Sequence, residues 1–354
     1  MLMEASFPFS LSAANQQPCY RGGPATLVCK AVIDETHDSK TFVFEDSQSR
    51  SFDFKPGQYI SFKFEIEGKL CPRAYSICST PTRPHNVQIT VKRVPGGLVS
   101  NWLNDHMRPR MSVEIADIAG RFNYFDIPSP KPLLLSGGSG VTPVMSMLQY
   151  ITDVADQVDV EFVHFARTPK DIIFRDQLEF IARRFSNIKV HMVVGETGEE
   201  TCFRGRMGTI SASLMQSLVP DLPQREIFMC GPEGFMKAAR AMAAEVPIRA
   251  VYEESFGERI PIEEPDKLGG EVYFSLSGKH GTCAPGETIL EAALNSGIWI
   301  ESSCHQGVCG SCKVKLTQGM VDMQDLGGLP ACERSEGFVL ACCSRPMGSV
   351  SIDA

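Results

Sequence analysis

Short apolar segments separated by turn residues make up the first third of the chain. Glycine, proline, asparagine and aspartate divide these segments from one another. Many short strands with turn signals between them are typical of a small antiparallel β-barrel. We therefore expect residues 24–126 to form such a barrel. The expected strands are Ala25–Ile33, Thr41–Glu45, Gln58–Glu65, Val87–Arg93 and Met111–Ile115.

From Lys131 onwards the pattern alternates between short apolar runs and longer amphipathic segments. Such βαβ alternation predicts a parallel sheet with helices on both faces, and we assign it to residues 127–260. The expected strands are Pro132–Leu135, Asp159–Phe165, Ile188–Val194 and Glu226–Met229, and the expected helices are Pro143–Thr152, Arg175–Phe185, Thr209–Leu218 and Gly234–Glu245.

Residues 260–270 are rich in proline, glycine and charge, which is typical of a linker. Beyond it, Glu271–Ser277 and Gly281–Ala284 read as a hairpin, and Glu287–Asn295 as a short helix. A cysteine-rich loop and a strand at Lys313–Leu316 follow. The pattern thus predicts a third, α+β domain over residues 271–354.

Composition is that of an ordinary globular protein, with 354 residues, 43% apolar and 21% charged. No apolar run approaches the ~18–20 residues of a membrane span, and the apolar patch Phe7–Ala14 has no basic residue before it. The net charge of −8 argues against nucleic acid as a partner. We expect a cytoplasmic protein that binds neither nucleic acid nor membrane.

Charge is unevenly distributed along the chain. From Glu263 to the end there are 12 acidic and 6 basic residues. An acidic domain of this kind can steer docking to a basic patch on a partner, or it can simply keep the surface solvated.

Six of the 13 cysteines lie in the last 51 residues, which points to a metal centre. Cys304-x4-Cys309-x2-Cys312 is followed, after 29 further residues, by Cys342. This is the spacing of plant-type [2Fe–2S] proteins, in which four thiolates bind two irons. A zinc site is the weaker alternative, because the x4 spacing is atypical of zinc ribbons. Cys343 is an alternative fourth ligand.

A second motif, Arg73-Ala74-Tyr75-Ser76, ends an expected barrel strand. Arginine can bind a phosphate with two hydrogen bonds, tyrosine offers an aromatic face to a flavin, and serine a hydroxyl at the ring edge. Downstream, the segment Val94–Ser100, which contains Gly97, Val99 and Ser100, precedes an apparent helix at Asn101–Leu103, and glycines before a helix suit an anion site. Together these segments predict a flavin site.

Two strand-to-helix turns in the second domain predict a nicotinamide site. The first contains Gly138, Gly140 and Thr142, and the second Cys230, Gly231 and Pro232. Both turns are expected at the carboxyl edge of the parallel sheet, where ligands bind. Cys230 could touch the nicotinamide, and Phe256 at the end of the domain could cover the flavin ring.

The order of these motifs resembles the ferredoxin–NADP⁺ reductase superfamily, specifically its reductases fused to a C-terminal ferredoxin. Segments such as FKPGQYISFKFEIEG and ITVKRVPGGLVSNWL are most similar to reductase components of Rieske-type monooxygenases that act on glycine betaine and related quaternary amines. The reductase of hybrid-cluster protein is the next most similar group. The resemblance implies a β-grasp ferredoxin domain and FAD as the flavin. It also implies that the residues of the flavin motif bind FAD and that the residues of the two strand-to-helix turns bind the nicotinamide nucleotide.

The interpretation is an NAD(P)H oxidoreductase in which Ser76, Cys230 and Phe256 take part in catalysis. Hydride passes to the flavin, and single electrons then pass through the cluster to a separate oxygenase. Hybrid-cluster protein as acceptor and a redox-sensing binding protein are the alternatives. NADH is expected rather than NADPH, because Asp171 would repel a 2′-phosphate beside Arg167 and Lys170.

Overall fold

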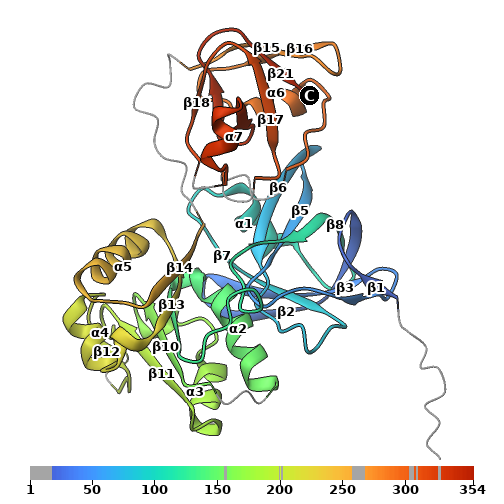
Figure 1. The fold of residues 1–354 in the computed structure, drawn as a ribbon. Coiled ribbons are helices and arrows are strands. Elements are labelled where there is room, and N and C mark those ends of the chain that lie inside the picture. Colours follow the sequence, from blue (N-terminus) through green and yellow to red (C-terminus); the bar gives the residue numbers. More distant parts are fainter. Residues whose placement is uncertain are drawn as a thin grey trace, which may run out of the picture.

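The computed structural model describes residues 18–154, 158–198, 200, 202–256, 268–302, 307, 310–325 and 328–354. Three units follow one another along the chain: an antiparallel barrel, a parallel α/β sheet and a smaller mixed sheet (Figure 1). The predicted fold class is thereby confirmed. The patch Phe7–Ala14 and most of the predicted linker lie outside the described residues.

The barrel is a six-stranded antiparallel sheet in the order β6-β5-β8-β2-β3-β7. A bridge between Ile77 and Ile89 closes it, since it joins the end of β6 to β7. The two-stranded pair β1–β4 lies outside this sheet. The elements are β1 (Cys19–Tyr20), β2 (Ala25–Thr36), β3 (Ser39–Asp46), β4 (Ser51–Phe52), β5 (Tyr59–Ile66), β6 (Lys69–Ser76), β7 (Val87–Lys92), α1 (Leu98–His106) and β8 (Ser112–Ala119).

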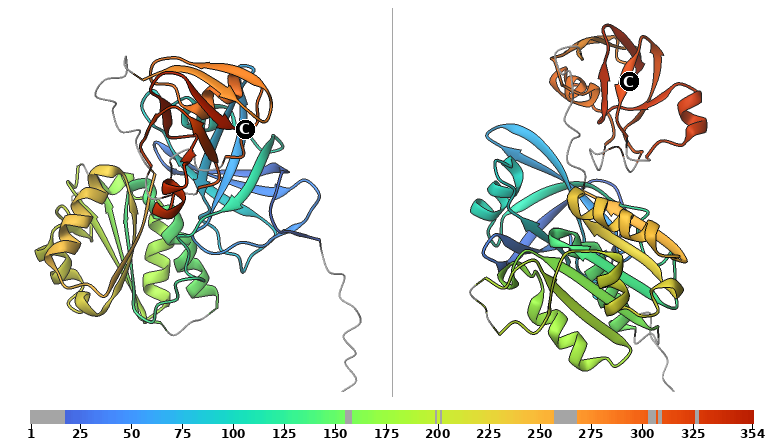
Figure 2. Two further views of the ribbon diagram at one scale, coloured as in Figure 1. Left: turned by 45° about the horizontal axis from the view of Figure 1, so that its top comes forward. Right: turned by 90° about the vertical axis from the view of Figure 1, so that its left-hand side faces the viewer.

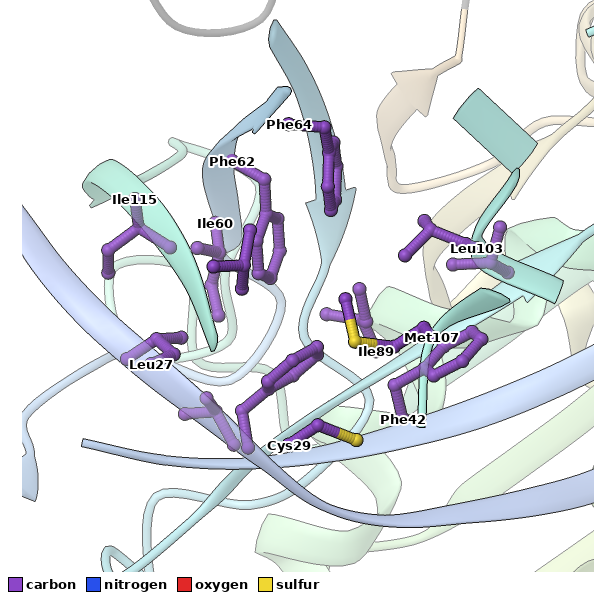
Figure 3. Packing of buried hydrophobic residues seen from close by; sticks show 14 of the residues in the cluster. Leu27, Cys29, Phe42, Ile60, Phe62, Phe64, Ile89, Leu103, Met107 and Ile115 are labelled. Carbon is purple, nitrogen blue, oxygen red and sulfur yellow. The ribbon is translucent and has the colours of Figure 1, made fainter. Parts of the chain in front are cut away.

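Alternating apolar residues of the barrel strands point inward and fill the barrel (Figure 3). Phe62 and Phe64 stack with ring centroids 5.3 Å apart. Leu103 of α1 and Met107 cover one end of this core. Each buried side chain of this size contributes ~1.5–3 kcal/mol, so the barrel is stabilised mainly by its own interior.

The second unit is a six-stranded, entirely parallel sheet in the order β12-β11-β10-β9-β13-β14. Helices α2 and α3 cover one face, and α4 and α5 the other. Its elements are β9 (Pro132–Gly137), α2 (Val141–Asp153), β10 (Val160–Ala166), α3 (Arg175–Arg184), β11 (Ile188–Val194), β12 (Arg206–Met207), α4 (Ala212–Leu218), β13 (Glu226–Gly231), α5 (Glu233–Glu245) and β14 (Ala250–Ser255), with short 3-10 turns at Gly138–Gly140, Pro169–Asp171 and Leu222–Gln224.

The third unit is a mixed five-stranded sheet in the order β16-β15-β21-β17-β19, with α6 packed against it. Thr288 and Glu291 form a capping box at the start of α6. The elements are β15 (Gly270–Phe274), β16 (Lys279–Cys283), α6 (Ile289–Asn295), β17 (Lys313–Gln318), β18 (Val321–Met323), α7 (Ala331–Ser335), β19 (Phe338–Leu340), β20 (Ser344–Pro346) and β21 (Val350–Asp353).

Polar contacts join the barrel to the parallel sheet. Gln149 of α2 donates to the carbonyl of Cys78 at 2.9 Å, and Ser146 donates to the carbonyl of Ser79 at 2.6 Å. On the other side of this seam, the carboxylate of Glu35 accepts hydrogen bonds from Thr41 and from the backbone of Phe174, which precedes α3. The barrel thus supplies the cap that this helix lacks from its own sequence.

Within the described part of the chain, no helix has both the length and the apolarity that crossing a membrane requires.

Candidate redox site

The two predicted nicotinamide turns meet at the carboxyl ends of adjacent strands. Strands β9 and β13 pair directly, with Ser136 opposite Cys230. A Cβ atom on Gly140 would lie 2.2 Å from the carbonyl oxygen of Cys230, so only glycine lets the two turns approach this closely. The structure therefore brings together Gly138, Gly140, Thr142, Cys230, Gly231 and Pro232.

The Phe235 ring packs directly against both turns. A Cβ atom on Gly137 or on Gly231 would lie within 2.7 Å of ring atoms of Phe235. Thr142 is held within the first turn by a 3.1 Å hydrogen bond from its hydroxyl to the carbonyl of Ser139. The start of α2 therefore lies where β9 and β13 end, a position that suits an anionic dinucleotide.

The flavin motif occupies the last residues of β6. Tyr75 contacts Phe62 and Phe64 edge-on, and burial raises the pKa of its hydroxyl. Arg73 is exposed, and its guanidinium donates to the neighbouring carbonyl of Pro72 at 2.7 Å. Ala74 lies between them on the strand and is half-buried.

Ser76 makes a contact that the sequence did not reveal. Its hydroxyl donates to Oε2 of Glu254 at 3.1 Å, across 178 residues of sequence. Both side chains are buried. Glu254 lies in β14, directly opposite Cys230 of β13 in the strand register. The hydroxyl, carboxylate and thiol thus come together where the barrel meets the parallel sheet.

Cys230 and Phe256 both lie near this junction. Burial, together with the nearby Glu254 carboxylate, raises the pKa of the Cys230 thiol well above its usual value. Cys230 therefore remains a neutral thiol at physiological pH. Phe256 is half-buried and packs against the hydrophobic cluster that contains Cys230.

Helix α1 begins earlier than the sequence suggested, at Leu98 rather than near Asn101. Gly97 is its N-cap residue and supplies no side chain to the free N–H groups of the first turn. Val99 and Ser100 are buried within that turn, where the Ser100 hydroxyl accepts a 3.2 Å hydrogen bond from the backbone of Val94. The uncapped turn is compatible with the predicted phosphate contact.

Two of the four predicted cluster ligands can be located. Cys312 and Cys342 are buried in the core of the third unit, and the backbone of Ala341 donates to the carbonyl of Cys312 at 2.9 Å. Cys304 and Cys309 lie outside the described residues. Cys343 is equally buried, and its thiol donates to the carbonyl of Leu340 at 3.6 Å. A Cβ atom on Gly307 would lie 2.8 Å from its sulfur, so Cys343 packs against the cluster loop.

Comparison with known protein families matches all three units. The models for an oxidoreductase FAD-binding domain, an oxidoreductase NAD-binding domain and a 2Fe-2S iron-sulfur cluster binding domain match residues 25–124, 134–241 and 275–347. The glycine betaine monooxygenase reductase subunit of Pseudomonas aeruginosa is 39% identical over 352 residues, which is 94% of this chain and 96% of that protein. The chain belongs to the reductases that fuse FAD, NAD and [2Fe–2S] domains.

Other members of this reductase family are also similar to the chain. The stachydrine N-demethylase reductase subunit of Rhizobium meliloti is 34% identical and covers 93% of this chain and 96% of its own length. The solved structure of phthalate dioxygenase reductase has a TM-score of 0.70 at 24% identity, over 94% of this chain and 98% of that one. That structural similarity supports the three-domain fold.

The residues of this reductase fit the cofactors of the family. The glycine turns and uncapped helix starts suit the phosphates of two dinucleotides, and half-buried Tyr75 offers a flat apolar surface for a flavin. Buried Cys312 and Cys342 supply sulfur ligands of the kind that an iron–sulfur cluster needs.

The residues expected to choose between NADH and NADPH differ in their exposure. The Asp171 carboxylate is buried and accepts hydrogen bonds from the backbone and hydroxyl of Thr168. It also lies 3.7 Å from the Lys92 ammonium. The Asp171 carboxylate is thus turned inward and partly neutralised, and its repulsion of a 2′-phosphate stays a prediction. Arg167 remains largely exposed.

Proposed function

We propose that this reductase takes electrons from NADH and passes them singly to a separate Rieske-type oxygenase that demethylates a quaternary amine. The observation that carries the proposal is the complete set of three redox domains together with 39% identity to the glycine betaine monooxygenase reductase subunit. The stachydrine N-demethylase relative also supports a methylated amine as the substrate class of the partner.

Three residues at the junction of the barrel and the parallel sheet, Ser76, Cys230 and Phe256, have different roles in hydride transfer. Ser76 keeps its proton directed at Oε2 of Glu254, and the neutral Cys230 thiol adds no charge beside the nicotinamide turns. Phe256 and the surrounding hydrophobic cluster exclude water from this junction. When bound, FAD accepts the hydride and releases its two electrons one at a time.

The cluster supplies the outward step. A plant-type cluster has a potential near −400 mV and a Rieske centre roughly −150 to +300 mV. Electron flow to a Rieske-type partner is therefore downhill by about 250 mV or more.

The dinucleotide proposed is NADH. The relatives are divided on this point, since the NADH oxidoreductase HCR of Escherichia coli is 32% identical and an NADPH oxidoreductase of Mycobacterium tuberculosis 31%.

Reconstitution tests the proposal. The purified reductase is mixed with NADH, oxygen, glycine betaine or stachydrine, and a Rieske-type oxygenase that acts on that amine. We expect formaldehyde release that depends on all components, and a higher kcat/KM for NADH than for NADPH. Failure to reduce the oxygenase would contradict the proposal.

Hybrid-cluster protein is the second candidate acceptor, on the sequence resemblance described above. Turnover with hybrid-cluster protein but not with the oxygenase would favour it. A redox sensor, the third possibility, would show no sustained NADH-dependent reduction of cytochrome c.

A further inference from the structure

Trp299 is a large aromatic side chain that the third domain does not use in its own core. Its neighbours Ile298 and Ile300 are both buried in that core, whereas Trp299 is 51% exposed. Trp299 therefore faces outward between two inward-facing neighbours. The segment leads directly into the loop that begins with the predicted ligand Cys304, so the position of Trp299 is tied to that of the cluster loop.

The indole ring contacts the barrel domain. The ammonium of Lys63 lies 4.2 Å from the centroid of the Trp299 ring, within the range of a cation–π interaction. Lys63 belongs to β5, between buried Phe62 and Phe64, and it points away from the barrel interior. The ribbon views agree in placing the third domain beside the end of the barrel that carries β5 and β6 (Figures 1 and 2).

The contact falls on the strand pair that carries the flavin motif. In the register of β5 and β6, Lys63 lies opposite Pro72, and Phe62 lies opposite Arg73. Phe64, the next residue after Lys63, contacts Tyr75 edge-on. A contact at Lys63 is therefore made on the same strand pair, β5 and β6, that ends at Ser76 of the flavin motif.

Among the residues that the structure describes, the Lys63 ammonium contacts the Trp299 ring and forms no ion pair. The side chain is half-buried, so the indole face is the partner that compensates its charge. This pairing distinguishes Lys63 from an ordinary solvated surface lysine.

We propose that Trp299 and Lys63 form the docking contact that holds the [2Fe–2S] domain at electron-transfer distance from the flavin domain. The inference rests on the proposed route from flavin to cluster. Each transfer moves one electron from the reduced flavin to the oxidised cluster, and NADH supplies the pair upstream. Trp299 and Lys63 are positioning residues, which set the population of the docked arrangement and take no electrons themselves.

Anaerobic stopped-flow mixing of the holoprotein with NADH tests this role. The variants are Trp299→Ala and Lys63→Met, with Trp299→Phe and Lys63→Arg as conservative partners. We expect Trp299→Ala and Lys63→Met to leave flavin reduction unchanged and to slow cluster reduction about threefold to tenfold, the population change expected for a contact of this strength. The conservative variants should retain most of the rate. Leu276→Ala is the matched control, because Leu276 is 79% exposed on the same domain.

Small-angle X-ray scattering provides a readout independent of turnover. Both disruptive variants should increase the radius of gyration, and the double variant should equal the single ones because the two residues act through one contact. If the parent reduces its cluster normally and Trp299→Ala matches it in both measurements, the docking contact is refuted. Additive effects in the double variant refute the pairing. If NADH cannot reduce the cluster of the parent, the proposed function itself fails.

Discussion

The buried contact between Ser76 and Glu254 shows why single residues of this site are hard to identify from sequence. Glu254 belongs to a run of two glutamates that reads as an ordinary charged strand end. Its neighbour Glu253 is indeed exposed and pairs with Arg240 at 3.0 Å. Only the strand register, which sets Glu254 opposite Cys230, separates the two roles.

Removing this contact should slow hydride transfer. Ser76→Ala removes a hydrogen bond to a charged group, worth ~1.5–3 kcal/mol, and Glu254→Gln replaces the carboxylate that accepts this bond with a neutral amide. We therefore expect NADH-dependent flavin reduction to fall about 10- to 100-fold, with flavin content unchanged. Stopped-flow absorbance measures the rate, and Glu253→Gln is the control. A Glu254→Gln rate equal to that of Glu253→Gln would contradict the assignment.

His164 provides a second test at the scale of one residue. It lies in β10, fully buried, with Nδ1 2.9 Å from the Ser136 hydroxyl and Nε2 without a hydrogen-bond partner. Burial lowers the pKa of His164 to about 4, with a smaller effect from Lys92. Below pH 6.5, the ordinary pKa of histidine, His164 is protonated in the unfolded chain but stays neutral in the folded protein. Acid therefore destabilises the fold.

His164→Gln should therefore reduce the acid sensitivity of the protein. Between pH 7 and pH 4.5 the parent should lose roughly 2–3 kcal/mol more stability than the variant. Urea titrations at the two pH values measure the difference. Titration of the carboxylates changes the free energy of unfolding of both proteins equally, so it cancels from the difference between them. If the free energies of unfolding of parent and variant change with pH in parallel, the pKa of His164 is the same in the folded and unfolded states, which contradicts the prediction.

At the scale of elements, the sequence predicted what periodicity and spacing can encode. The barrel strands and the first strands of the parallel sheet have strong apolar patterns, and their order determined the architecture. Strand β14 was not recognised, because its sequence AVYEES alternates weakly and contains two glutamates. It is held by pairing with β13 at the sheet edge. The early start of α1 was hidden behind the glycines that precede it.

The cluster loop poses the sharpest element-scale question. Cys342 and Cys343 are equally exposed, at 7%. Cys342, the first cysteine of the segment LACC, remains the proposed ligand on the resemblance to plant-type proteins. Cys342→Ser should abolish the cluster absorption and cytochrome c reduction, whereas ferricyanide reduction by NADH persists. Iron content and absorption spectra provide the measurement. Cluster loss in Cys343→Ser alone would reverse the choice.

The glycine turns allow a test of element packing. In Gly140→Ala the added methyl would meet the Cys230 carbonyl oxygen and carbon at 2.2 and 2.4 Å. Both are backbone atoms, so β9 and β13 must separate at the nicotinamide turns. We expect a KM for NADH raised at least about tenfold, consistent with a displaced turn. Gly234→Ala, where the space is open, is the control. Unchanged kinetics in Gly140→Ala would contradict the close approach.

At the scale of the molecule, a charge cluster joins the barrel to the parallel sheet. The Lys92 ammonium lies 2.8 Å from Asp38 of the barrel and 3.7 Å from Asp171 of the neighbouring domain. Burial opposes ionisation of Asp38, but hydrogen bonds from Lys92, Thr36 and Ser39 keep its pKa below the usual value. The Lys92 ammonium thus lies beside Asp38 and Asp171, two of the three side chains in the group His37, Asp38 and Asp171 that could hold a cation.

Removing this lysine should loosen the seam. Lys92→Met leaves the exposed Arg167 guanidinium, 3.9 Å from Asp38 and 3.7 Å from Asp171, as the remaining cation beside these two carboxylates. We expect the variant to lower the free energy of unfolding by about 1–3 kcal/mol, less than for a fully buried pair. Lys30→Met, which breaks the exposed pair with Glu45, should cost less than about 1 kcal/mol. Urea titration compares the two variants. Equal losses would show that the seam contributes no more than a surface ion pair.

The separation of Ser76 from Glu254 also has a consequence for biosynthesis. A ribosome adding ~5–20 residues each second needs on the order of 10–35 s to synthesise the 178 positions between them. During that interval the nascent barrel carries its serine without the carboxylate, and the parallel sheet lacks its last strand. The electron-transfer junction is therefore completed late in translation, immediately before the iron-binding domain is synthesised.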